Sequence, residues 1–185
     1  MKRILFLFIA GILFTTIASA QPKTVTDYYL AMPSNLYNFN QVKDKVALIK
    51  DRKKNIKIED IKNGYLRIES NDWEGFGEVA LFKKGDGSYI IGQTEVGCGP
   101  ICTGSVDFWT YQAGTWTNVT KQVLTFSKAD LNKIFAERHV EESERAAYFE
   151  LPRVGRKMKL KLGEGGEGDD VLAEFDWNSV RFVTY

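Results

Sequence analysis

The segment Glu78-Val79-Ala80-Leu81-Phe82 runs into the turn Gly85-Asp86-Gly87 and then into Ser88-Tyr89-Ile90-Ile91. Two short runs of apolar and β-branched residues joined by a glycine-containing turn are typical of a β-hairpin. We therefore expect antiparallel strands here, and the same pattern recurs along most of the chain. Further strands are predicted at Ile56 and Ile58, Tyr65 to Ile68, Val106 to Tyr111, Thr115 to Thr120, Tyr148 to Leu151, Lys157 to Leu162 and Val171 to Tyr185.

Helical spacing of apolar residues predicts a few short helices beside these strands. Thr24 is a capping residue for a helix that reaches Met32, and Pro33 ends it. A second short helix is expected over Val42 to Lys50, with Val46, Leu48 and Ile49 on its inner side. The clearest helix is Ser127 to Arg138, because Ser127 caps it and Asp130 lies in its first turn.

The fold class that follows is α+β, with a predominantly antiparallel sheet of meanders and hairpins packed by two or three short helices. A helix followed by several strands occurs before residue 120 and again after residue 127. A degenerate helix-plus-sheet repeat and a chance likeness of aromatic-rich hairpins both fit this order.

The first twenty residues have the pattern of an export signal. Lys2 and Arg3 precede an apolar stretch, and Ala18-Ser19-Ala20 is an A-x-A cleavage pattern. We expect residues 1–20 to be a cleaved signal peptide and residues 21–185 a single α+β domain, with halves 21–120 and 121–185 as an alternative division. The protein is then periplasmic or secreted, with no membrane span after removal of the signal.

The composition excludes several classes of protein. Of 185 residues, 26% are charged and 44% are apolar, which excludes a disordered chain and a multi-span membrane protein. Without the leader the chain has 23 basic and 24 acidic residues, so its net charge is −1. A nearly neutral surface gives no reason to expect nucleic acid as a partner. The one basic run, Lys50 to Lys54, is interpreted as a solvated turn.

Two cysteines lie in the stretch Cys98-Gly99-Pro100-Ile101-Cys102. In an exported protein with two cysteines, a disulfide between them is the default expectation. The spacing is C-x-x-x-C, whereas a thioredoxin-like redox pair is C-x-x-C at the start of a helix. We therefore predict a structural disulfide that closes a short loop.

Catalytic and metal-binding patterns are absent from the sequence. His139 is the only histidine, and it follows the helix that begins at Ser127 without a ligand pattern around it. We expect no catalytic residue, no metal site and no cofactor. Acid pairs such as Asp72 with Glu74, or Asp169 with Asp170, leave a sugar hydrolase as an alternative.

The candidate binding site is the segment Asn71-Asp72-Trp73-Glu74-Gly75-Phe76-Gly77. Trp73 and Phe76, with Asp72 and Glu74, are expected in a loop between two strands, where aromatic side chains bind partners well. The other interpretation is that both rings fold back over the sheet edge. The leading hypothesis is an exported, non-enzymatic binding or inhibitor-like module of the bacterial envelope that recognises an envelope protein or glycan. The alternative is a hydrolase acting on envelope sugars through paired carboxylates.

Four motifs together carry a resemblance, namely Gly64-Tyr65-Leu66, Cys98-Gly99-Pro100-x-Cys102, Phe108-x-x-Tyr111 and Trp116-x-x-Val119-Thr120. They resemble a group of exported bacterial α+β domains with a C-G-P-x-C loop and a W-x-x-V-T strand end, for which no function is known. The resemblance covers roughly residues 24–120 and implies an exported α+β domain without an activity. In size and layout alone, the chain is also similar to the β-lactamase inhibitor proteins.

Overall fold

The computed structural model describes residues 24–34, 44–71, 73–163 and 170–184. The described residues form two antiparallel sheets, one of six strands and one of four. Sheet 1 contains β1 (Ile56–Asp60), β2 (Tyr65–Ile68), β3 (Gly75–Lys83), β4 (Tyr89–Cys98), β5 (Cys102–Gln112) and β6 (Thr115–Asn118), in that spatial order. Sheet 2 contains β7 (Ala147–Glu150), β8 (Lys157–Leu162), β9 (Val171–Trp177) and β10 (Phe182–Thr184), again with each strand beside the next.

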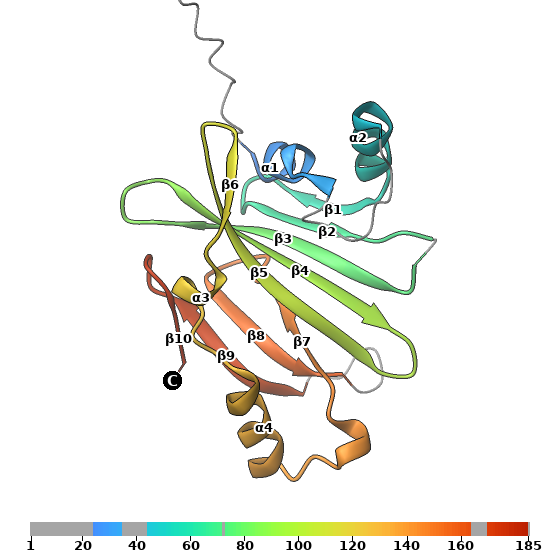
Figure 1. The fold of residues 1–185 in the computed structure, drawn as a ribbon, viewed down its shortest axis with the longest axis vertical. Coiled ribbons are helices and arrows are strands. Elements are labelled where there is room, and N and C mark those ends of the chain that lie inside the picture. Colours follow the sequence, from blue (N-terminus) through green and yellow to red (C-terminus); the bar gives the residue numbers. More distant parts are fainter. Residues whose placement is uncertain (1–23, 35–43, 72, 164–169, 185) are drawn as a thin grey trace, which may run out of the picture.

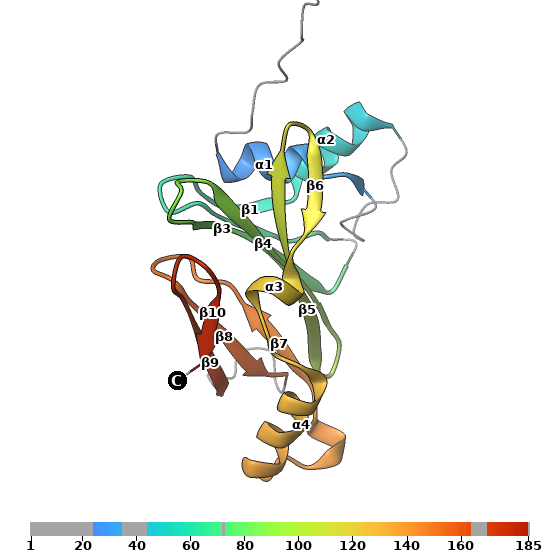
Figure 2. The same cartoon turned by 60° about the vertical axis from the view of Figure 1, so that its left-hand side comes forward.

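The molecule is layered, with helices on one face of sheet 1 and sheet 2 on its other face (Figure 1). The helices α1 (Val25–Ala31) and α2 (Lys45–Lys54) lie above sheet 1, and sheet 2 lies below it (Figure 2). The chain passes from sheet 1 to sheet 2 through α3 (Thr120–Val123), α4 (Lys128–Glu137) and the short 3₁₀ helix Glu142–Glu144. Among the described residues, no helix combines the length and the apolar character that crossing a bilayer requires.

Strand alternation divides the apolar residues of sheet 1 between two cores. On β3, Ala80 and Phe82 face sheet 2, whereas Val79 and Leu81 face α1. The core below sheet 1 contains Phe108, Met158, Leu160, Phe175 and Trp177, whereas the core above it contains Tyr29, Met32, Leu66 and Ile91. Successive strand residues point to opposite faces, so a strand with apolar residues at consecutive positions needs cover on both.

The predicted fold class is confirmed, because the chain forms antiparallel meanders packed by short helices. The predicted disulfide is also present, between Cys98 and Cys102, which pair across the end of the β4–β5 hairpin. Thr24 and Ser127 cap their helices as predicted, and in the structure each cap is a full capping box. The proposed signal peptide and most of the loop Gly163 to Asp170 lie outside the described residues.

Strand β3 begins earlier than the sequence predicts, at Gly75 instead of Glu78. Gly75 pairs with Gly97 and has a φ of +140°. A Cβ at position 75 would lie 2.0 Å from the carbonyl oxygen of Val96, so only glycine allows this approach of β3 to β4. Sequence periodicity missed these pairs because glycines contribute no apolar signal.

Helix α2 corrects two predictions about residues 42–54. The helix begins after the capping residue Asp44 and continues to Lys54, so the basic run lies on a helix rather than in a turn. Leu48 is buried as predicted, but Val46 is 75% exposed. Arg52 belongs to the basic run that was expected to be solvated, but its side chain is fully buried.

Arg52 joins α2 to the end of α1. Its guanidinium donates hydrogen bonds to the carbonyl oxygens of Tyr29, at 2.9 Å, and of Met32. Its guanidinium carbon also lies 5.3 Å from the centre of the Tyr29 ring. The last carbonyl oxygens of a helix lack N–H donors from a following helical turn. A buried helix end therefore needs other donors, and the guanidinium of Arg52 supplies them here.

We predict that Arg52→Met lowers the free energy of unfolding by about 3 kcal/mol, because it leaves buried carbonyl groups without their donor. Urea denaturation followed by circular dichroism measures the change. Lys53→Met is the matched control, since Lys53 is the exposed neighbour on the same helix, and it should change the value by less than about 0.5 kcal/mol. Equal effects of the two substitutions would contradict the role given to Arg52.

Candidate functional site

The residues of the predicted aromatic loop lie in different surroundings. Trp73 is half-buried in the connection between β2 and β3, and its ring covers Gly75. Glu74 is exposed, and its carbonyl oxygen accepts a hydrogen bond of 2.9 Å from the backbone N–H of Cys98. Asp72 lies outside the described residues.

Phe76 lies within β3 rather than in the loop. It is partly buried, with its ring centre 5.7 Å from the ring centre of Tyr148, and it packs against Val96 and Cys102. The guanidinium carbon of Arg67 lies 3.8 Å from the centre of the Phe76 ring, within the range of a cation–π contact. Phe76 therefore faces the space between the sheets, and the structure does not bring it beside Trp73 at one loop tip.

A hollow of about 290 Å³ opens beside this connection. One wall is the turn after α2, and the other wall is the end of β2 and the start of β3. Its lining carries ammonium, amide, hydroxyl and carboxylate groups and little apolar surface; the residues are Lys54, Asn55, Ile56, Lys57, Glu69, Ser70, Asn71 and Gly75. Gly75 lines the hollow and is also the residue that the ring of Trp73 covers, whereas Trp73 itself is not among the lining residues.

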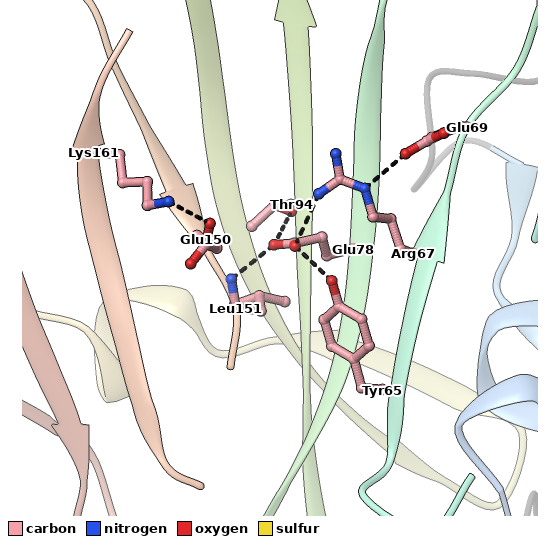
Figure 3. Close-up of polar contacts among 8 residues, drawn as sticks. All are labelled: Tyr65, Arg67, Glu69, Glu78, Thr94, Glu150, Leu151 and Lys161. Carbon is pink, nitrogen blue, oxygen red and sulfur yellow. Dashed lines mark hydrogen bonds and ion pairs between the residues drawn. The ribbon is translucent and has the colours of Figure 1, made fainter. Parts of the chain in front are cut away.

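A second constellation surrounds Glu78, whose side chain is 1% exposed and points from β3 into the space between the sheets (Figure 3). Its carboxylate accepts hydrogen bonds from the hydroxyl of Tyr65, at 2.7 Å, and from the backbone N–H of Leu151, at 2.7 Å. The hydroxyl of Thr94 donates a longer bond of 3.4 Å. Because Leu151 follows β7, this carboxylate links sheet 1 to sheet 2.

Charged neighbours extend this network to the surface on both sides. Arg67 lies 3.6 Å from the carboxylate of Glu78 and is also paired with Glu69 at 2.8 Å. On the side of sheet 2, Lys161 is paired with Glu150 at 2.8 Å. Burial raises the pKa of Glu78 to about 7, although Leu151, Tyr65 and Arg67 each favour its ionised form.

The Glu78 network is suited to holding the sheets together rather than to catalysis. Its carboxylate oxygens already accept bonds from three donors, and Glu78 lines neither the hollow beside Trp73 nor the larger groove described below. Glu78 was not among the predicted site residues, although an acid directly before the apolar run Val79 to Phe82 was a signal. His139 is exposed beyond the end of α4.

Comparison with known proteins finds a similar fold but identifies no function. No family model and no curated protein matches the chain. A similar solved structure is that of a domain of an uncharacterized protein from Porphyromonas gingivalis W83, with a TM-score of 0.51 and 12% sequence identity. The match covers 87% of this chain and 97% of that chain. At this identity the similarity shows a shared arrangement of helices and sheets only.

We predict that the free energy of unfolding falls as pH rises from about 4.5 to about 7. In that window the folded protein keeps the proton on Glu78, whereas the unfolded chain, with the ordinary pKa of 4.5, has lost it. The stabilisation from this group is complete below pH 4.5 and is lost as pH rises through 7. The full effect is about 3 kcal/mol, which urea denaturation at a series of pH values measures.

Glu78→Gln removes the titrating group while it keeps the shape of the side chain, so its unfolding free energy should change less over this pH range than that of the wild type. Glu74→Gln, at an exposed carboxylate of the neighbouring connection, should keep the wild-type slope. If Glu78→Gln and the wild type have the same slope, the carboxyl of Glu78 does not retain its proton in this range.

Proposed function

We propose that this protein is an exported, non-enzymatic binding module of the bacterial envelope that recognises its partner at the connection between β2 and β3. The observation that carries the proposal is a polar hollow of about 290 Å³ whose lining includes Gly75, the residue that the half-buried ring of Trp73 covers. Of the two partner classes expected from the sequence, protein and glycan, the chemistry of the hollow favours a glycan.

A sugar ring presents apolar C–H faces and a rim of hydroxyl groups. An aromatic face next to polar groups suits both, because the ring packs against the indole while hydroxyl groups bond to the polar lining. Lys57, Ser70 and Asn71 supply ammonium, hydroxyl and amide groups for this purpose. The volume lies near the lower end of the range for ligand pockets, roughly 300–1,000 Å³, so we propose a fragment of one or two sugar units as the bound unit.

The alternative from the sequence, a sugar hydrolase, is less well supported. Such an enzyme needs two carboxylates across the scissile bond, one of them with a raised pKa. Glu78 has a raised pKa, but it is 1% exposed and its oxygens accept three hydrogen bonds. Glu69 lines the hollow, whereas Glu74 is exposed outside its lining.

The proposal is tested by binding of the purified protein to an array of bacterial cell-wall glycan fragments, with affinities of the positive fragments measured by calorimetry. We expect binding that Trp73→Ala weakens at least about tenfold, since aromatic anchors carry much of a binding energy. Trp116→Ala is the matched control, because Trp116 is a half-buried tryptophan on β6, at the opposite end of the sheet from this connection (Figure 1).

Equal loss in both tryptophan variants would indicate general destabilisation and contradict a site at Trp73. Retention of a protein from envelope extract by the wild type and not by Trp73→Ala would support the site but assign it a protein partner. Release of smaller sugars from any fragment would favour the hydrolase instead.

A further inference from the structure

A groove of about 720 Å³ lies between α4 and the β9–β10 side of sheet 2, away from the connection at Trp73. One wall is formed by the segment Leu124 to Phe126 and by α4, and the other wall by β9 and β10. Polar and charged residues also line it, and its apolar lining residues are Leu124, Phe126, Ile134, Leu172, Ala173, Phe175, Phe182 and Val183. The groove is large enough for a ligand of several residues, since pockets for small ligands span roughly 300–1,000 Å³.

The wall at β10 is the open edge of sheet 2. Within the described residues, β10 pairs with β9 alone, and the sheet ends there. The hairpin closes with a hydrogen bond from the N–H of Asn178 to the carbonyl of Arg181. Hydrogen-bonded and non-bonded pairs alternate along an antiparallel ladder, so Phe182 and Thr184 fall on the non-bonded pairs. Their backbone N–H and C=O groups therefore point away from β9, toward the open edge.

The strand at this edge, β10, is short, with three residues, but it carries neither of two features that commonly block strand addition. Edge strands are commonly protected by charged side chains or proline. The edge strand β1 of sheet 1 carries Lys57 and Glu59, whereas β10 consists of Phe182, Val183 and Thr184. An edge strand without charged side chains, beside a groove that has apolar as well as polar residues in its walls, is suited to pairing with another strand.

Two cations and three carboxylates line the groove, and within the described part of the chain one of these two cations has no ion pair. Lys133 is paired with Glu137 at 3.7 Å, and Glu174 with Lys157 at 2.8 Å. Asp130 caps α4 by accepting hydrogen bonds from Ser127. Arg181 is exposed at the start of β10 and has no ion pair within the described part of the chain. A ligand with an acidic group would complement this site.

We propose that this groove binds an extended polypeptide segment of a partner protein, which adds to sheet 2 as a strand beside β10. The backbone of the segment pairs with Phe182 and Thr184, its alternate apolar side chains enter the groove, and an acidic side chain pairs with Arg181. Strand addition of this kind obtains affinity from main-chain hydrogen bonds and specificity from side-chain pockets. The proposal is independent of the function assigned to Trp73.

The test uses a library of random twelve-residue peptides displayed on phage and selected against the purified protein. We expect enrichment of sequences with alternating apolar residues and an acidic residue. The best peptide is then synthesised with a normal backbone and with N-methyl groups at alternate residues, which remove the donors needed for pairing. N-methylation on the pairing side should weaken binding at least about tenfold, and amide NMR shifts on binding should include Phe182 and Thr184.

Two matched pairs of variants test the geometry. Thr184→Pro removes the N–H that faces the open edge and should weaken binding about as much as N-methylation, whereas Thr184→Ala keeps this donor and should bind like the wild type. Arg181→Gln should weaken binding severalfold, and Arg138→Gln, at an exposed arginine next to α4, should not.

Three results would overturn the proposal. The first is that no sequence is enriched over a surface without protein, and the second is that both forms of the peptide bind equally. The third is that the protein without peptide forms a dimer that Thr184→Pro dissociates, since the edge then pairs with a second copy of this chain.

Discussion

Sheet 1 carries apolar side chains on both of its faces, and the remainder of the fold follows from the need to cover them. Leu66, Val79 and Ile91 are covered by α1, whereas Phe82 and Phe108 are covered by sheet 2. Among the described residues, both large apolar clusters include residues of sheet 1, so each cover depends on sheet 1 as much as sheet 1 depends on it. Two groups that would be costly to bury alone are Arg52, which donates to carbonyl groups at the end of α1, and Glu78, which lies at the contact between the two sheets.

These buried polar groups differ in what they contribute. Arg52 donates to carbonyl groups at the end of α1 and holds the helical layer in one position. Glu78 accepts from the backbone of Leu151 and joins the sheets, but its burial makes the ionised form unfavourable. A protonated Glu78 can donate to the hydroxyl oxygen of Tyr65, because that hydroxyl rotates to accept. The contact between the sheets therefore persists on either side of neutral pH, with different proton positions.

The two candidate binding surfaces lie at the margins of the two sheets. The hollow beside Trp73 is at the end of sheet 1, where β1 and β2 stop pairing and the chain turns toward β3. The groove beside β10 is at the open edge of sheet 2. The first offers an aromatic ring and polar side chains, which suit a glycan, and the second offers backbone groups and apolar side chains, which suit an extended polypeptide.

Features that depend on near neighbours in the chain could be predicted from the amino-acid sequence: the antiparallel hairpins, the capped helices at Thr24 and Ser127, and the pairing of Cys98 with Cys102. Packing between distant segments sets which face each strand buries, turns Phe76 toward Tyr148 instead of toward Trp73, and buries Arg52. The reason is separation along the chain. Glu78 and Leu151 are 73 residues apart, and local periodicity carries no information about which distant backbone group a side chain will meet when two sheets pack together.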